Sequence, residues 1–128
     1  MTGADVERTV VIADDDADTR SLLAVQLRGI ATVVGVAATW EEALTILATK
    51  RPDVLVTDER MPGDDQPLAV RLAAARVASP DTAVVVFCGF GDAVEARSAG
   101  AADFVRKPAT ALAIRNAVAN ATAGPATS

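Results

Sequence analysis

The chain has 128 residues, 51% hydrophobic and 23% charged, which suits one folded domain rather than a disordered segment. The net charge is −5 and no basic run occurs, which argues against direct nucleic-acid binding, because phosphate contacts need clustered Lys and Arg. The absence of histidine excludes His-based triads, His-ligated zinc and a role as a phosphohistidine carrier.

Strand and helix patterns alternate along the sequence. Apolar, β-branched runs predict strands, and apolar residues at helical spacing between them predict helices. In chain order, the expected strands are 9–13, 32–36, 53–57, 82–88 and 102–106, and the helices that follow them are 19–29, 39–50, 67–78, 92–100 and 109–121.

Local signals mark several helix ends. Thr39 and Glu42 have the spacing of a capping box, and Pro67 suits the first turn of the third helix. Gly29 and Gly100 are expected to stop the helices that precede them.

The expected strands are continuous apolar runs without inside–outside alternation. Such strands are typical of a parallel sheet that helices cover on both faces. Right-handed crossovers then predict a doubly wound α/β domain. We expect residues 1–122 to form this domain and residues 123–128 to be a disordered tail.

The cellular compartment is predicted from three sequence features: the apolar stretches, the N-terminal residues and the number of cysteines. No apolar stretch approaches the length of a membrane span, and the N-terminal residues lack the pattern of a signal peptide. Cys88 is the single cysteine, so it cannot form an internal disulfide. These features predict a cytoplasmic protein that does not associate with membranes.

Acidic residues follow two of the expected strands, and a lysine follows another. Asp14 and Asp15 come after the first strand, Asp58 after the third and Lys107 after the fifth. Each alone has a plainer interpretation, as a helix cap, a turn residue or a solvated charge. In a doubly wound sheet, however, ligands bind beyond the carboxyl ends of the strands, so these residues are expected to converge.

Convergence of these acids would be costly without a counter-charge. Two carboxylates about 4 Å apart repel by roughly 4 kcal/mol at an effective dielectric constant near 20. Mg²⁺, or Mn²⁺, would relieve this repulsion because hard oxygen ligands suit it, and Lys107 would add a further positive charge.

Three segments carry a resemblance to a known family. They are VVIADDDADTR, VLVTDERMPGDD and FVRKP, in this order and at the expected strand ends. With them the chain resembles a receiver domain of the two-component response regulators, over nearly its whole length. The resemblance implies a flavodoxin-like sheet with strand order 2-1-3-4-5.

The resemblance also implies a role for each motif residue. Asp58 matches the phosphoacceptor, and Asp14 and Asp15 match the acid pair that holds Mg²⁺ directly or through water. The backbone carbonyl of Arg60 matches the third metal ligand from the protein. Lys107 matches the lysine that pairs with the phosphoryl oxygens.

Two further positions follow from the same match. Pro108 matches the proline that usually follows a cis peptide bond. Asp65 matches the acidic residue of a D-G pair in the loop after the phosphoacceptor, with Gln66 in place of glycine.

The sequence departs from the family at the switch residues. Cys88 stands where the family usually has Ser or Thr at the end of the fourth strand, and residues 83–92 contain neither. A thiol is a weak hydrogen-bond donor, which puts the usual coupling in doubt. Phe104 matches the aromatic switch residue but has no phenolic oxygen.

The fourth helix is expected to be short. The family usually has about three more residues here, close to one helical turn. This helix belongs to the face that many family members use to dimerise or signal. The shortening is therefore either an unusual partner surface or a neutral deletion.

The leading functional hypothesis is a receiver that accepts a phosphoryl group on Asp58 from a histidine kinase or phosphotransfer protein. It would not be an enzyme beyond Mg²⁺-dependent self-phosphorylation and slow autodephosphorylation. Its partners would include a downstream protein or an output domain, and a homodimer could form through the helix 4–strand 5–helix 5 face. The alternative is a pseudo-receiver that acts as a phosphorylation-independent interaction module.

Two other enzyme classes do not match. A dehalogenase-like phosphatase needs a second carboxylate two residues after its nucleophile, where this chain has Arg60. A dinucleotide-binding fold needs a Gly-rich turn after its first strand, where this chain has ADDDAD.

Overall fold

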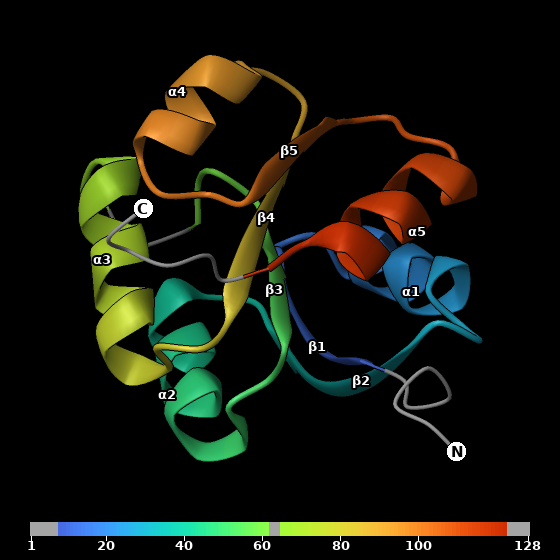
Figure 1. The fold of residues 1–128 in the computed structure, drawn as a ribbon, viewed down its shortest axis with the longest axis horizontal. Helices are drawn as coiled ribbons and strands as arrows, with labels where there is room; N and C mark the ends of the chain where they lie inside the picture. Colours follow the sequence, from blue (N-terminus) through green and yellow to red (C-terminus); the bar gives the residue numbers. More distant parts are fainter. Residues whose placement is uncertain (1–7, 62–64, 123–128) are drawn as a thin grey trace.

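The structure, a computed structural model, describes residues 8–61 and 65–122. Within this part of the chain, five strands alternate with five helices, as the sequence predicts (Figure 1). In chain order the elements are β1 (Arg8–Ala13), α1 (Ala17–Gln26), β2 (Ala31–Ala37), α2 (Trp40–Lys50), β3 (Val54–Thr57), α3 (Leu68–Ala78), β4 (Ala83–Cys88), α4 (Ala93–Ser98), β5 (Asp103–Arg106) and α5 (Ala111–Asn120).

The strands form one parallel sheet in the order β2-β1-β3-β4-β5, which confirms the predicted fold class. From β1 the chain first crosses to β2 and then returns to β3 on the other side of β1. The carboxyl ends of β1 and β3 therefore lie at the topological switch point, where this class of fold binds ligands. Ala13 pairs with Thr57, so Asp14 and Asp58 leave neighbouring strands at the same height.

Helices cover both faces of the sheet and enclose two apolar cores. α1 and α5 lie on one face, and α2 and α3 lie on the other (Figure 1). Ile12 and Val56 face the α1–α5 core, whereas Val11 and Leu55 face the other core. All four side chains are at most 1% exposed, and burial of each stabilises the fold by about 1.5–3 kcal/mol.

In four helices, the side-chain oxygen of the N-cap residue accepts from one backbone N–H of the first turn. Asp16, Thr39, Asp92 and Thr110 are the N-cap residues of α1, α2, α4 and α5. Thr39 and Glu42 bond reciprocally, so the predicted capping box is confirmed.

Most helix limits differ from the prediction by one to three residues, and two of these differences involve residues that the sequence had singled out. α1 ends at Gln26, before Gly29, because residues 27–30 already form a turn, and Gly29 itself has a φ of +89°. Pro67 precedes α3 instead of lying in its first turn, because its ψ of 151° is extended. Neither difference moves a residue of the predicted site.

α4 is six residues long, which agrees with the short helix expected from the sequence. Ala96 is its buried residue, and the helix packs mainly along β5. The predicted tail, 123–128, lies outside the described residues.

Candidate functional site

The backbone of the sheet holds two aspartates at one edge. The Asp14 N–H donates to the carbonyl of Ala37 at 3.0 Å, and the Asp58 N–H donates to the carbonyl of Ala13 at 3.0 Å. Asp14 is 1% exposed, whereas Asp15, the next residue, is exposed. Hydrogen bonds that continue the sheet therefore fix both Cα positions, and they turn Asp14 inward.

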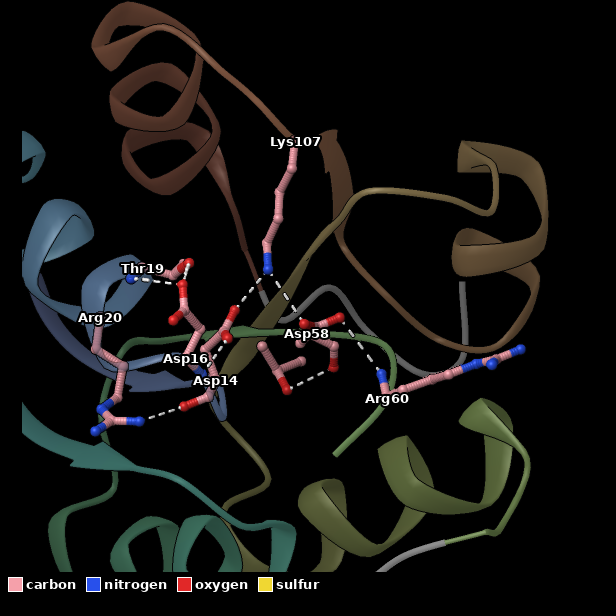
Figure 2. Close-up of polar contacts among 8 residues, drawn as sticks. Asp14, Asp16, Thr19, Arg20, Asp58, Arg60 and Lys107 are labelled. Carbon is pink, nitrogen blue, oxygen red and sulfur yellow. Dashed lines mark hydrogen bonds and ion pairs between the residues drawn. The ribbon is translucent and has the colours of Figure 1, made fainter. Parts of the chain in front are cut away.

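Lys107 joins these two carboxylates. Its Nζ donates to Oδ2 of Asp14 at 2.8 Å and to Oδ2 of Asp58 at 3.1 Å (Figure 2). Burial acts to lower the pKa of Lys107, but the hydrogen bonds and charges of the two aspartates outweigh it and raise the pKa above its usual value. Lys107 is therefore a cation at neutral pH and partly compensates the charge of the buried Asp14 and the partly buried Asp58.

Three carboxylates gather beside this lysine. One oxygen from each of Asp14, Asp15 and Asp58 lies within 4.8 Å of the other two. Carboxylate oxygens at this spacing are hard ligands of the kind that Mg²⁺ and Mn²⁺ prefer. The acids that the sequence placed at separate strand ends thus converge, as a receiver magnesium site requires.

The backbone around Asp14 is fixed by the start of α1. The N–H of Asp16 donates to Oδ1 of Asp14 at 2.9 Å, and Arg20 donates to the Asp14 carbonyl at 2.8 Å (Figure 2). Asp16 itself caps the helix, and its hydrogen bonds with Thr19 lower its pKa. Asp16 therefore has the capping role, and Asp14 and Asp15 remain for the pocket. The sequence did not identify Arg20 as part of the site, because a charged residue on a helix is usually solvated.

The loop after β3 contacts Asp58 directly. The N–H of Arg60 donates to Oδ1 of Asp58 at 3.4 Å, and the hydroxyl of Thr57 donates to the Asp58 carbonyl at 2.9 Å. The guanidinium of Arg60 extends away from the acids (Figure 2) and lies 4.9 Å from the centre of the Phe90 ring. Asp65 is exposed. Pro62, Gly63 and Asp64 lie outside the described residues.

Cys88 lies at the end of β4 beside Asp58. Its side chain is fully buried, and it ends the strand that pairs with β5. Burial raises the pKa of the thiol, and the nearby Asp58 carboxylate adds to this, against backbone N–H groups of Phe90 and Glu59. The thiol is consequently protonated at neutral pH.

Two further positions that the sequence predicted, Phe104 and Pro108, lie on β5 and just after it. Phe104 is partly buried against the α2–α3 core, and the Lys107–Pro108 peptide bond is cis. The guanidinium of Arg106 lies 5.6 Å from the Phe104 ring centre and donates to the carbonyls of Gly89 and Gly91. The sequence did not single out Arg106, because its acceptors are backbone carbonyls about fifteen residues away.

A family model for the response regulator receiver domain matches residues 10–119 of this chain. The chain belongs to that family. The match covers β2 to β5, most of β1 and every residue of the acidic site. A receiver is a phosphorylation-signalling module of two-component systems.

Curated relatives and solved structures agree with this assignment. The chain is 41% identical over 108 residues to protein-glutamate methylesterase/protein-glutamine glutaminase 5 of Myxococcus xanthus, covering 81% of this chain and 31% of that protein. It is 38% identical over 105 residues to the positive alginate biosynthesis regulatory protein of Pseudomonas aeruginosa, covering 77% of this chain and 41% of that protein. The chain thus spans less than half the length of these two relatives.

Among solved structures, the signal receiver domain of NarL from Mycobacterium tuberculosis superposes with a TM-score of 0.77 at 32% identity, covering 88% of this chain and 93% of that chain. In the described residues, no helix is long and apolar enough to cross a membrane.

Proposed function

We propose that Asp58 accepts a phosphoryl group from a histidine kinase or a histidine phosphotransfer protein. The observation that supports this most directly is the Lys107 ammonium, which bridges Asp14 and Asp58 at 2.8 and 3.1 Å. The second oxygen of Asp58, Oδ1, accepts from the N–H of Arg60 at 3.4 Å, and the carboxylate lies at the edge where this fold binds ligands.

The transfer needs a nucleophile and charge compensation. A carboxylate oxygen of Asp58 attacks phosphorus, and the bond from phosphorus to the donor breaks, so the leaving group departs with the electron pair. Lys107 holds a phosphoryl oxygen while the charge is redistributed. The N–H of Arg60, 3.4 Å from Oδ1, orients the carboxylate.

We propose that Asp14, Asp15, Asp58 and the backbone carbonyl of Arg60 hold Mg²⁺ or Mn²⁺. The donor set fits such an ion, because three carboxylate oxygens lie within 4.8 Å of one another beside a single lysine. When bound, the ion would neutralise negative charge on the transferring phosphoryl oxygens.

Intact-mass analysis tests the phosphoacceptor. Incubation with acetyl phosphate and Mg²⁺ should add one phosphoryl group to the wild-type chain and none to Asp58→Asn. Asp65→Asn is the matched control, because it removes an exposed acid that follows the same loop and should keep the adduct. If the wild-type chain forms no phosphoryl adduct, or if Asp58→Asn still forms one, the proposal is wrong.

Calorimetry tests the metal site. We expect weak Mg²⁺ binding without phosphate and weaker binding in Asp15→Ala, since a hard ligand is lost while the buried Asp14–Lys107 pair remains. Asp18→Ala, which removes an acid from the first turn of α1, is the control. Equal affinities in wild type and Asp15→Ala would show that the metal site is assigned wrongly.

A pseudo-receiver is the second candidate, favoured by Cys88 and by the six-residue α4. Such a chain would act as an interaction module without phosphorylation, and the mass experiment separates the two. In either case we propose a downstream protein or an output domain as the partner, with the α4–β5–α5 face as a homodimer surface. The domain limits 1–122 remain a prediction.

A further inference from the structure

The loop between β4 and α4 is held from β5 by one arginine. Arg106 ends β5 and pairs in register with Cys88 at the end of β4. Its guanidinium donates to the carbonyl of Gly89 at 3.2 Å and to the carbonyl of Gly91. A guanidinium presents several donors in a fixed plane, so one side chain satisfies both carbonyls, which a lysine does less well.

The same loop is also held from the β3 side. The guanidinium of Arg60 stacks on the Phe90 ring at 4.9 Å. Gly91 has a φ of +87°, and a Cβ there would lie 2.6 Å from Oε1 of Glu59, so the loop lies close against the segment that follows Asp58. The loop conformation is therefore specified by contacts from both neighbouring strand ends.

This loop is the link between the site and α4. The loop consists of residues 89–91. Cys88, which lies beside Asp58, precedes it, and Asp92, the N-cap residue of α4, follows it. Arg106 also lies over Phe104, with its guanidinium 5.6 Å from the ring centre. Arg106 thus contacts both the loop and the aromatic residue of β5, while its own side chain is exposed.

We propose that Arg106 holds the β4–α4 loop in the conformation of the unphosphorylated protein and so sets how far phosphorylation shifts α4. This rests on the proposed function of Asp58. The contacts form without a phosphoryl group, and interactions present in one of two states favour that state. The acyl phosphate on Asp58 carries roughly 1.5–2 negative charges beside Cys88, in place of the charge of the carboxylate. A movement of Gly89 toward it would lengthen or break the hydrogen bond from Arg106 to the Gly89 carbonyl.

Amide spectra of free and beryllofluoride-bound protein test this. In Arg106→Gln without beryllofluoride, the amide chemical shifts of residues 89–98 should change. Each peak should lie part of the way along the line between its positions in free and in beryllofluoride-bound wild type. Hydrogen exchange in α4 should become faster by about threefold or more, because the helix loses the restraint on its N-terminal loop. Arg106→Lys should resemble Arg106→Gln, since it keeps the charge but loses the planar pair of donors.

Two controls separate this role from a general structural one. Arg76→Gln removes the same charge from an exposed side chain of α3 and should leave residues 89–98 at their wild-type positions. The urea midpoint of Arg106→Gln should stay close to that of wild type, because water can solvate the freed Gly89 carbonyl.

The proposal is overturned if the signals of 89–98 stay in place in Arg106→Gln, or move off the line. It is also overturned if Arg106→Lys behaves as wild type. If beryllofluoride leaves wild-type spectra unchanged, the proposed phosphorylation of Asp58 fails instead, and hydrogen exchange in the free proteins alone decides whether Arg106 restrains the loop.

Discussion

Arginines donate to pairs of backbone carbonyls in two regions of this protein, with different surroundings. In the α1–α5 layer, Arg115 donates to the carbonyl of Gln26, the last residue of α1, at 3.1 Å and to that of Arg28, just beyond the helix, at 2.7 Å. Beside α4, Arg106 donates to the carbonyls of Gly89 and Gly91.

The packing behind the two contacts is what differs. α1 and α5 are each ten residues long and bury Leu23, Ile114 and Val118 almost completely. α4 is six residues long and buries Ala96, which offers far less apolar area. The same hydrogen-bonding group therefore stabilises the whole domain in the first region, and selects a local loop conformation in the second.

The largest expected difference between the two regions comes from apolar truncation. Ile114→Ala should lower the free energy of unfolding by about 2–5 kcal/mol, because the side chain is fully buried and leaves a cavity. Val94→Ala in α4 should change it by less than about 0.5 kcal/mol, because that side chain is 76% exposed. Urea unfolding measures both, and equal losses would contradict the comparison.

Removal of the arginines should give a smaller difference. Arg115→Gln should lower the free energy of unfolding by about 1–2 kcal/mol, because charge-assisted bonds to two carbonyls at the end of a packed helix are lost. Arg106→Gln should cost less than about 0.5 kcal/mol, as its side chain is exposed. A larger loss in Arg106→Gln than in Arg115→Gln would reverse the assignment of roles.

Alkaline pH should destabilise the protein through the site next to α4. The folded state raises the pKa of Cys88, so its contribution is complete below the unfolded value of about 8.5 and is lost as pH rises toward the folded pKa. The raised pKa of Lys107 acts in the same direction, from about pH 10.4 upward.

Urea unfolding between pH 7 and pH 10 isolates the thiol. Cys88→Ser does not titrate in this range, so its free energy of unfolding should fall less steeply than that of wild type above about pH 8.5. Parallel curves would mean that ionisation of the thiol does not distinguish the folded from the unfolded state.

The smallest expected effect is on the response to phosphorylation. In Cys88→Thr, a hydroxyl replaces the weak thiol donor beside Asp58, so the phosphorylated conformation should gain a hydrogen bond. The beryllofluoride-induced shifts around α4 and Phe104 should become larger, after normalisation to the bound fraction. Equal amplitudes in both proteins would mean that Cys88 does not weaken the switch.

Local sequence determined the elements of this protein and the position of its acids along the chain. Short, β-branched apolar runs such as Val54–Thr57 are typical of strands covered on both faces, and the Thr39–Glu42 capping box marks the start of α2. Asp14, Asp58 and Lys107 follow strands, and parallel strands end at one edge, so their convergence was predictable.

Tertiary structure decided what depends on neighbours far away in the chain. Asp14 and Asp15 are adjacent and chemically identical, yet Asp14 is buried and Asp15 is exposed. The hydrogen bond from the Asp14 N–H to the Ala37 carbonyl continues the β1–β2 pairing and orients Asp14. The partners of Arg106 are backbone carbonyls, which every residue carries, so no side-chain pattern could indicate them. Those contacts exist only because β4 and β5 lie side by side in the folded sheet.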